Sequence, residues 1–234
     1  MKEKRKKLAI IQSNYIPWKG YFDMIGLVDE FIIYDEVQYT KNDWRNRNKI
    51  KTAQGVQWLT IPVYQKNLHQ KISETEVSDK KWNIKHWNTL VTNYGRAPHF
   101  KTGSAVFEEF YKTVTTPNLS EINTTLIQTI CRLLGMPTKI THSSAYVLEG
   151  DPTARLVNLC KQTQSLCYLS GPAAKSYLQE DMFASEGIEV QWMDYSNYPE
   201  YPQLFPPFEH GVSILDLLFN TGPESIHYMK WSKP

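Results

Sequence analysis

The chain has 234 residues, 41% of them hydrophobic, and its 26 Lys and Arg nearly balance 24 Asp and Glu. This composition excludes collagen-like, low-complexity and mostly disordered chains, because it supplies enough apolar side chains for a core. No apolar run reaches the roughly 18 residues of a membrane span. The net charge of +2 conceals two basic segments, 2–7 and 41–51, which carry +4 each on an otherwise acidic body.

The N-terminus and the cysteines bear on the cellular compartment. The basic start is followed only by LAIIQ, which is too short an apolar run for a signal peptide. The three cysteines show neither metal-type spacing nor an even count for disulfides, so Cys131 and Cys160 are predicted to be buried. We therefore expect a cytoplasmic protein without a metal site. Residues 1–7 are predicted to form a flexible basic tail, and 8–234 a single α/β domain.

The predicted elements alternate between strands and helices along the chain. Short apolar runs that end in turn residues predict strands at 8–13, 31–34, 57–63, 167–170 and 188–192. Helical spacing of apolar residues predicts helices at 17–29, 79–94, 107–114, 118–135, from 151, at 173–178 and at 213–219. Residues 35–51 and the proline-rich segment 197–208 are predicted loops, the second held by its aromatic residues. This order predicts a mostly parallel, Rossmann-like sheet with a helical cap inserted at about 79–135.

The segment IQSNYIPWKGYFD joins the first predicted strand to the first helix. Ligands of α/β sheets bind at the carboxyl ends of the strands, and helix N-termini offer free N–H groups to anions. Gln12 and Asn14 are therefore predicted binding residues, and Gly20 would allow a ligand to approach the backbone closely. Core packing is the competing interpretation for Trp18 and its aromatic neighbours, and for Gly20.

The segment DEVQYTKNDWRNRNKIK follows the second predicted strand. Asp35 and Glu36 at the strand end could act as a general base or hold a metal. Four bases suited to phosphate are Arg45, Arg47, Lys49 and Lys51. They would share one face if this part of the chain were extended, because side chains alternate along a strand. A solvated charged loop is the competing interpretation, but Trp44 within the run favours a binding surface.

Two further segments of the C-terminal half are candidates for the site. Ser170 and Gly171 end a predicted strand just before a helix, which is typical of an anion-binding loop and also of an ordinary turn. His210 beside Gly211 could act as a general acid or base, although a single loop histidine is more often structural. The remaining histidines have no metal-ligand spacing to one another.

Six segments together resemble the WbqC-like family of bacteria. They are IIQSNYIPWKGYFDMI, IIYDEVQYTKNDWRNRNKIKT, QWLTIPV, YLSGPAAKSYL, MDYSNYPEYPQLF and VSILDLLFNTGPES, and the resemblance spans about residues 8–225. Such proteins are typically encoded among surface-polysaccharide (O-antigen, capsule) genes. The resemblance therefore implies a nucleotide-linked amino sugar as substrate, and acylation or aminoacylation of its amine. It implies these site residues: Gln12, Asn14, Tyr15, Trp18, Gly20, Asp35, Gln38, Tyr39, Asp43, Trp44, Arg45, Arg47 and Lys49.

Three functions remain open on this sequence. The leading hypothesis is amide formation on the nucleotide-linked amino sugar, with Asp35, Tyr39 and His210 as catalytic residues and ATP or an activated acyl donor as co-substrate. The second is an ATP-dependent ligase that forms an acyl-adenylate. Nucleotidylyl-transferase-like enzymes carry an HxGH tetrad where this chain has WKGY at 18–21, so both histidines are replaced. The third is a non-catalytic protein that binds nucleotide sugars or, less favoured, nucleic acid.

Overall fold

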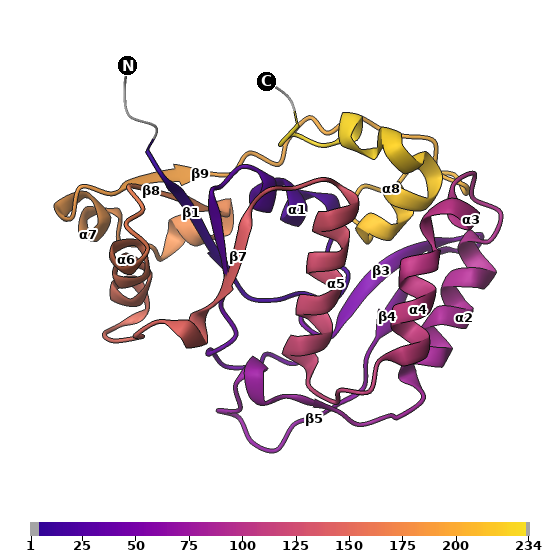
Figure 1. The fold of residues 1–234 in the computed structure, drawn as a ribbon, viewed down its shortest axis with the longest axis horizontal. Coiled ribbons are helices and arrows are strands. Elements are labelled where there is room, and N and C mark those ends of the chain that lie inside the picture. The colour runs from indigo at the N-terminus through magenta and orange to yellow at the C-terminus, as the bar shows by residue number, and fades with distance from the viewer. Residues whose placement is uncertain (1–4, 233–234) are drawn as a thin grey trace.

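The computed structural model describes residues 5–232, and a five-stranded parallel sheet occupies one end of the molecule (Figure 1). The sheet has the order β7-β2-β1-β8-β9. Its strands are β1 (Lys7–Ile11), β2 (Glu30–Ile33), β7 (Lys139–His142), β8 (Cys167–Ser170) and β9 (Glu189–Trp192). Counted along the chain this is the Rossmann order 3-2-1-4-5, which reverses between β1 and β8. The predicted α/β class and Rossmann-like sheet are confirmed.

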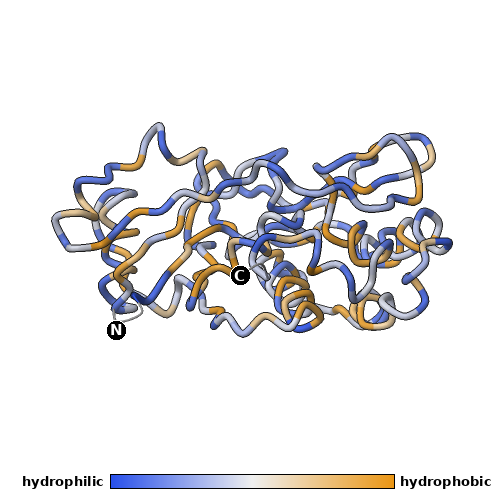
Figure 2. Tube along the Cα trace, turned by 90° about the horizontal axis from the view of Figure 1, so that it is seen from above, coloured by the Kyte–Doolittle hydropathy of each residue, from blue (hydrophilic) through white to orange (hydrophobic). Residues whose placement is uncertain are grey.

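Helices cover both faces of this sheet because successive strand residues point to opposite sides. Ala9 and Ile33 belong to the apolar cluster that includes α1 (Lys19–Gly26), α5 (Leu119–Leu133) and α8 (Ile214–Thr221). Leu8 and Ile10 belong to a second cluster, with α6 (Pro152–Gln162) and α7 (Glu180–Ser185). Figure 2 shows hydrophobic stretches running along the strands at this end of an elongated molecule.

A long insertion between β2 and β7 forms the cap, which we define as residues 47–113. It contains β3 (Arg47–Thr52), β4 (Gly55–Thr60), β5 (Val63–Tyr64), β6 (Glu76–Val77), α2 (Trp82–Tyr94), α3 (Phe100–Gly103) and α4 (Ala105–Thr113). Strands β3 and β4 form an antiparallel hairpin. Helix α5 then runs between the cap and the sheet (Figure 1). Its N-terminus is capped by the Asn118 side chain, which accepts from the Glu121 amide at 3.0 Å.

Several predicted boundaries need correction. The last five residues of the predicted loop 35–51 belong to strand β3, whose charged residues concealed the alternation. Strand β7 was not predicted, because its sequence KITH contains a single large apolar residue. The ordered chain begins before Leu8: β1 starts at Lys7, and the Lys6 ammonium donates to Glu30 at 2.8 Å. Residues 1–4 of the predicted tail lie outside the described residues. The short helix predicted at 173–178 is a 3-10 helix, Pro172–Ser176.

The proline-rich segment is irregular, as predicted, and aromatic residues fix it to two helices. The Tyr198 hydroxyl donates to Asp23 of α1 at 2.6 Å, and the Tyr201 hydroxyl donates to Asp216 of α8 at 2.8 Å. Between the two rings lies the ammonium group of buried Lys19, 4.6 Å and 5.2 Å from their centroids. These contacts close the C-terminal part of the chain over the start of α1.

The three cysteines are buried free thiols, which confirms the prediction for Cys131 and Cys160. Burial raises the pKa of both thiols to about 12, so neither forms a thiolate near neutral pH. Within residues 5–232, no three His, Cys, Asp or Glu side chains are grouped so that they could hold a metal ion. In the same range, no helix is both long enough and apolar enough to cross a bilayer.

Candidate functional site

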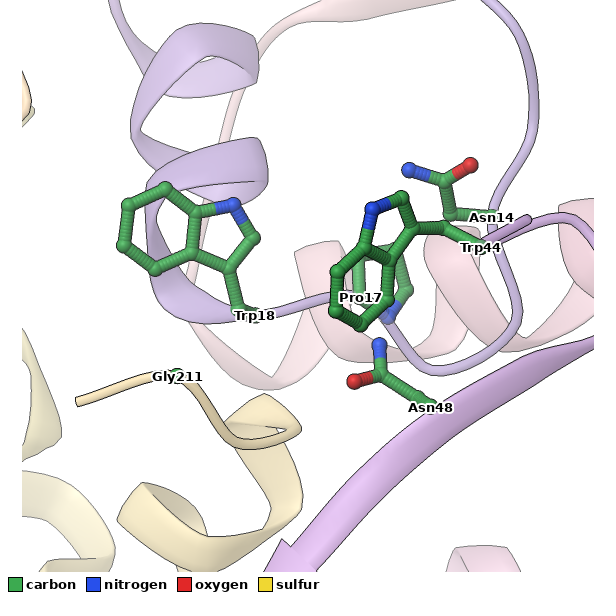
Figure 3. Close-up of a pocket in the computed structure, with 6 residues that line it drawn as sticks. All are labelled: Asn14, Pro17, Trp18, Trp44, Asn48 and Gly211. Atoms are coloured by element: carbon green, nitrogen blue, oxygen red, sulfur yellow. The ribbon is translucent and has the colours of Figure 1, made fainter. Parts of the chain in front are cut away.

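A pocket of about 310 Å³ opens between the start of α1, the loop before β3 and the loop before α8. We call it the cap-side pocket. Its lining residues are Asn14, Pro17, Trp18, Trp44, Asn48 and Gly211. In Figure 3 the two indole rings lie on opposite sides of the opening, and the carboxamides of Asn14 and Asn48 lie near the Trp44 ring. The pocket therefore offers flat apolar walls and a few directional polar groups, which is typical of ligand sites.

The Trp18 indole forms one wall and is held by neighbouring aromatic residues. Its ring centroid lies 5.2 Å from that of Tyr195 and 5.8 Å from that of Tyr198. A Cβ atom at Gly20 would overlap the same indole. Gly20 thus leaves room for a side chain of its own segment, and the prediction that it admits a ligand is corrected to packing.

The opposite wall is fixed by Arg45. Its guanidinium donates to the Asn14 carboxamide oxygen and lies 3.4 Å from the Asp43 carboxylate. The Asn14 NH2 group is left facing the space between the indoles (Figure 3). Asn48 instead supports the backbone beneath, donating to the carbonyl oxygens of Tyr15 and Ile16 at 3.1 Å and 2.9 Å. Asn14 is therefore the carboxamide best placed to bind a ligand.

An aromatic and cationic ledge continues the Trp44 wall; we define it as Trp44, Trp58, Arg47 and Lys49. Lys49 and Trp58 are direct partners in the β3-β4 hairpin, and the ammonium group lies 5.3 Å from the Trp58 centroid. The Arg47 guanidinium lies 4.2 Å from the same centroid, and the two indole centroids are 5.3 Å apart. Among the described residues, no carboxylate lies within ion-pair distance of Lys49. Its charge remains available to an anion.

The backbone of β3 is extended, which confirms the predicted alternation of its bases. The expectation for one of them, Lys51, needs a correction. Arg47 and Lys49 both reach the Trp58 ring. Lys51 is buried, and its ammonium group donates to the Pro207 carbonyl. The third base therefore ties the cap to the proline-rich segment and does not face solvent.

Three predicted site residues lie below the pocket. Asp35 is buried, and its two oxygens accept from the Ser13 amide at 2.8 Å and from the Ser120 hydroxyl. Tyr39 is buried in the main core, and burial raises the pKa of its hydroxyl. Tyr15 is fully buried and hydrogen-bonded to His86 and Tyr111. These side chains support the site, so we do not carry Asp35 or Tyr39 forward as catalytic groups or Tyr15 as a ligand contact.

His210 and Gln38 are exposed but differ in their position. His210 precedes Gly211 of the cap-side pocket, and its ring packs edge-on against Phe208 at 4.6 Å between centroids. Desolvation and the nearby charge of Lys19 lower the pKa of His210, so its ring is neutral at pH 7. Gln38 bridges to Lys71 and does not line the pocket.

Gln12 and Ser170 lie in a second pocket of about 420 Å³, which we call the switch-point pocket. It opens at the carboxyl ends of β1, β2 and β8, where the strand order reverses. The structure therefore separates Gln12 from Asn14, although only Ser13 lies between them in the sequence. Arg155 and Tyr34 also line this pocket, and neither was among the predicted site residues. Arg155 lies on a polar helix face, so only the strand order could have indicated its place.

Comparison with known proteins supplies the family. A model of the WbqC-like protein family matches residues 12–228. The chain belongs to this family. It is also 49% identical over 229 residues to the uncharacterized protein Rv1507c of Mycobacterium tuberculosis, an alignment that covers 97% of this chain and 99% of that protein. No solved structure gives a significant match. The predicted family is confirmed, while its chemistry stays a prediction.

In this WbqC-like chain, two motif blocks meet at the cap-side pocket. The IQSNYIPWKG block supplies Asn14 and Trp18, and the YTKNDWRNRNK block supplies Trp44 and the bases of the ledge. The later segment around 208–213 brings Gly211 to the same opening, with His210 next to it in the chain. Segments far apart in the sequence thus form one site with aromatic walls, a free amide and cations at its edge.

Proposed function

We propose that the protein transfers an acyl or aminoacyl group to the amine of a nucleotide-linked amino sugar that binds in the cap-side pocket. The observation that carries this proposal is that two indoles line the cap-side pocket beside the aromatic and cationic ledge. Indole faces stack on a planar base or on a sugar ring, and unpaired cations attract a diphosphate. Membership of the WbqC-like family supports the proposal through the surface-polysaccharide gene context that such proteins typically have.

In the proposed complex, each part of the substrate has a matching group. The base would lie against Trp44, the diphosphate beside Lys49 and Arg47, and the sugar toward Asn14 and Trp18. The Asn14 NH2 group would donate to a sugar oxygen, and Arg45 keeps that carboxamide oriented. Among the six lining residues there is no carboxylate to repel the diphosphate.

The proposed reaction joins the sugar nitrogen to the acyl carbon. The neutral amine attacks this carbon, the N–C bond forms, and the bond to the leaving group breaks with its electron pair on the leaving group. His210 accepts the proton that the nitrogen releases, which its lowered pKa permits at neutral pH. Asp35 takes no part, because Ser13 and Ser120 already occupy both of its oxygens.

Calorimetric titration with UDP-N-acetylglucosamine, a UDP-linked amino sugar and UMP tests the site. Trp44→Ala should weaken binding of the UDP sugars about tenfold, since a stacked aromatic contact contributes on the order of 1.5 kcal/mol. The unfolding midpoint should not change, because Trp44 is 41% exposed. The matched control is Tyr64→Ala, an exposed aromatic residue that lines neither pocket. Equal affinities of the wild type and Trp44→Ala would contradict the proposed base position.

An ATP-dependent ligase is the alternative, and the switch-point pocket in a Rossmann-type sheet favours it. Such an enzyme would activate a carboxylic acid as an acyl-adenylate and release pyrophosphate. Exchange of labelled pyrophosphate into ATP that depends on an added carboxylic acid would support the ligase. Transfer from a preformed thioester without ATP would support the direct reaction.

A further inference from the structure

The switch-point pocket lies on the side of the sheet that α6 and α7 cover. Its residues come from β1, β8, α6, the 3-10 helix after β8 and the loops next to these elements, including the loop after β2. Ile10, Val37 and Leu156 supply apolar wall, and Ala173 and Ala174 leave space because their side chains are small. The volume of about 420 Å³ is within the range of pockets that bind small molecules. The cap-side proposal leaves this pocket without an occupant.

Arg155 is the one charged side chain among the described residues that line the switch-point pocket. Its Nε–H donates to the Gly150 carbonyl at 2.9 Å, and Tyr34 lines the same pocket. No carboxylate in the described part of the chain lies within ion-pair distance of it. Nearby Asp151 accepts from the amides of Thr153 and Ala154 as the cap of α6. The guanidinium group of Arg155 therefore places a positive charge in the pocket, and no carboxylate of the described residues neutralises it.

The remaining polar groups are arranged around the same opening. Ser170 ends β8, and Gln12 follows β1, so a hydroxyl and a carboxamide lie at the two strand ends that flank the reversal of strand order. Tyr177 lines the rim and is 68% exposed, which leaves its flat ring available for stacking. One pocket thus combines a cation suited to phosphate with an aromatic ring suited to a base.

We propose that the switch-point pocket binds the adenosine-phosphate part of a co-substrate, with the phosphate at Arg155 and the base against Tyr177. ATP and coenzyme A thioesters share this chemical group. As the site of an acyl donor the pocket depends on the proposed transfer reaction, whereas binding itself is measured without any acceptor sugar.

The position of the two pockets suits a reaction between their occupants. Gln12 of one pocket and Asn14 of the other are two residues apart, so their Cα atoms are at most about 7 Å apart. Ser13 between them is buried; its amide donates to Asp35 at 2.8 Å, and its hydroxyl accepts from Asn123 at 3.1 Å. The cap-side and switch-point pockets therefore adjoin along this short, braced piece of chain.

Equilibrium binding of ATP, acetyl-coenzyme A and tripolyphosphate to the full chain tests the proposal. Arg155→Gln should weaken binding of all three about tenfold or more, because a guanidinium-phosphate hydrogen bond is lost. Ala173→Phe keeps the charge but fills the pocket, and should weaken binding of ATP and acetyl-coenzyme A to a similar degree. Tyr177→Ala should weaken these two nucleotides and leave tripolyphosphate unchanged. The control Arg96→Gln removes an equal charge from an exposed residue outside the pocket and should have no effect.

Each outcome is decisive. The proposal is overturned if neither nucleotide binds the wild type at millimolar concentration, if Arg155→Gln or Ala173→Phe binds as well as the wild type, or if Arg96→Gln weakens binding equally. Binding of ATP alone would indicate adenylation, and binding of acetyl-coenzyme A alone would indicate a thioester donor. Titrating the UDP sugars into Arg155→Gln separates this proposal from the cap-side one, since their affinity should not change.

Discussion

Three acidic side chains around the site are buried and hydrogen-bonded, whereas two basic side chains at or beside the pockets have no acidic partner among the described residues. Asp23, Asp35 and Asp216 are each at most 3% exposed and accept hydrogen bonds from hydroxyl or amide groups. Lys49 and Arg155, in contrast, border the cap-side and switch-point pockets. The carboxylates therefore hold the loops in place, and the cations remain for a ligand.

Burying these carboxylates costs free energy, because it removes a charged group from water. Burial raises the pKa of Asp23 and of Asp216, while their tyrosine partners lower it in part. The sequence places Asp35 beside Glu36 at a strand end, which is typical of catalytic acids and of structural ones. Only burial and hydrogen-bond partners separate the two roles. Three predictions test this contrast between buried supports and ligand-facing cations.

The largest effect is expected on stability, from Asp35→Ala. This change leaves the Ser13 amide and the Ser120 hydroxyl without their acceptor in a buried place, and should lower the free energy of unfolding by about 3–5 kcal/mol. Urea unfolding measures it, with Asp35→Asn as the conservative control, which retains one oxygen. A full loss of transfer activity with unchanged stability would instead indicate that Asp35 is a catalytic base. It would contradict the contrast between buried supports and ligand-facing cations.

A smaller effect is expected from buried His86 as the pH falls. Its Nε2–H donates to the Thr60 carbonyl at 3.2 Å, its Nδ1 accepts from Tyr15 at 2.8 Å, and burial lowers its pKa to about 4. Between pH 6.5 and 4 the unfolded chain binds a proton that the folded chain does not, so stability falls as the pH decreases. The loss is at most about 3 kcal/mol.

His86→Gln removes this titration and keeps an amide that can donate and accept. The wild type should therefore lose more stability than His86→Gln between pH 6.5 and 4 in urea unfolding at several pH values. All other titrating groups are common to both proteins. Parallel stability curves would show that the support beneath the cap-side pocket does not depend on a neutral imidazole.

The smallest effect is expected from Lys49→Gln at the ledge. A partly exposed charge next to a diphosphate contributes about 0.5–1 kcal/mol, so affinity for a UDP sugar should fall several-fold at low salt. The difference should vanish near 1 M salt, where the Debye length is about 3 Å. Lys80→Gln, an exposed lysine far from the ledge in the sequence, is the matched control. Salt-independent or absent effects would place the ligand elsewhere.

The spacing of apolar residues along the sequence predicted most of the fold. It failed at strands that consist mostly of polar residues. Helix α5 repeats apolar residues with helical spacing and is capped by Asn118, so its extent was predicted closely. Strand β3 alternates bases with Asn48 and Ile50, a pattern that reads as a loop until Trp58 of β4 supplies the partner surface. Strand β7 lies at the edge of the sheet, where a strand can form with only one large apolar residue in its sequence.

The candidate site was predicted by residue type but not by location. Trp18, Trp44, Asn14 and the bases of the ledge do gather at one pocket. Gln12 and Ser170 were grouped with them, although the sheet places these two at a separate opening. Neighbouring residues after a strand can face opposite sides of the sheet, and sequence spacing alone does not reveal which side has a pocket.

The central position of β1 has a consequence for biosynthesis. This strand pairs with β2 on one side, but its other neighbour is β8, in a register that joins Lys7 to Cys167. A ribosome must therefore complete most of the chain before β1 gains its second partner and before α6 can cover Leu8 and Ile10. Until then the nascent chain exposes an open strand edge and apolar side chains, which invites aggregation and chaperone binding. The switch-point pocket can therefore form only after β8 and the segment up to Tyr177 are made, and the cap-side pocket only after Gly211 is made.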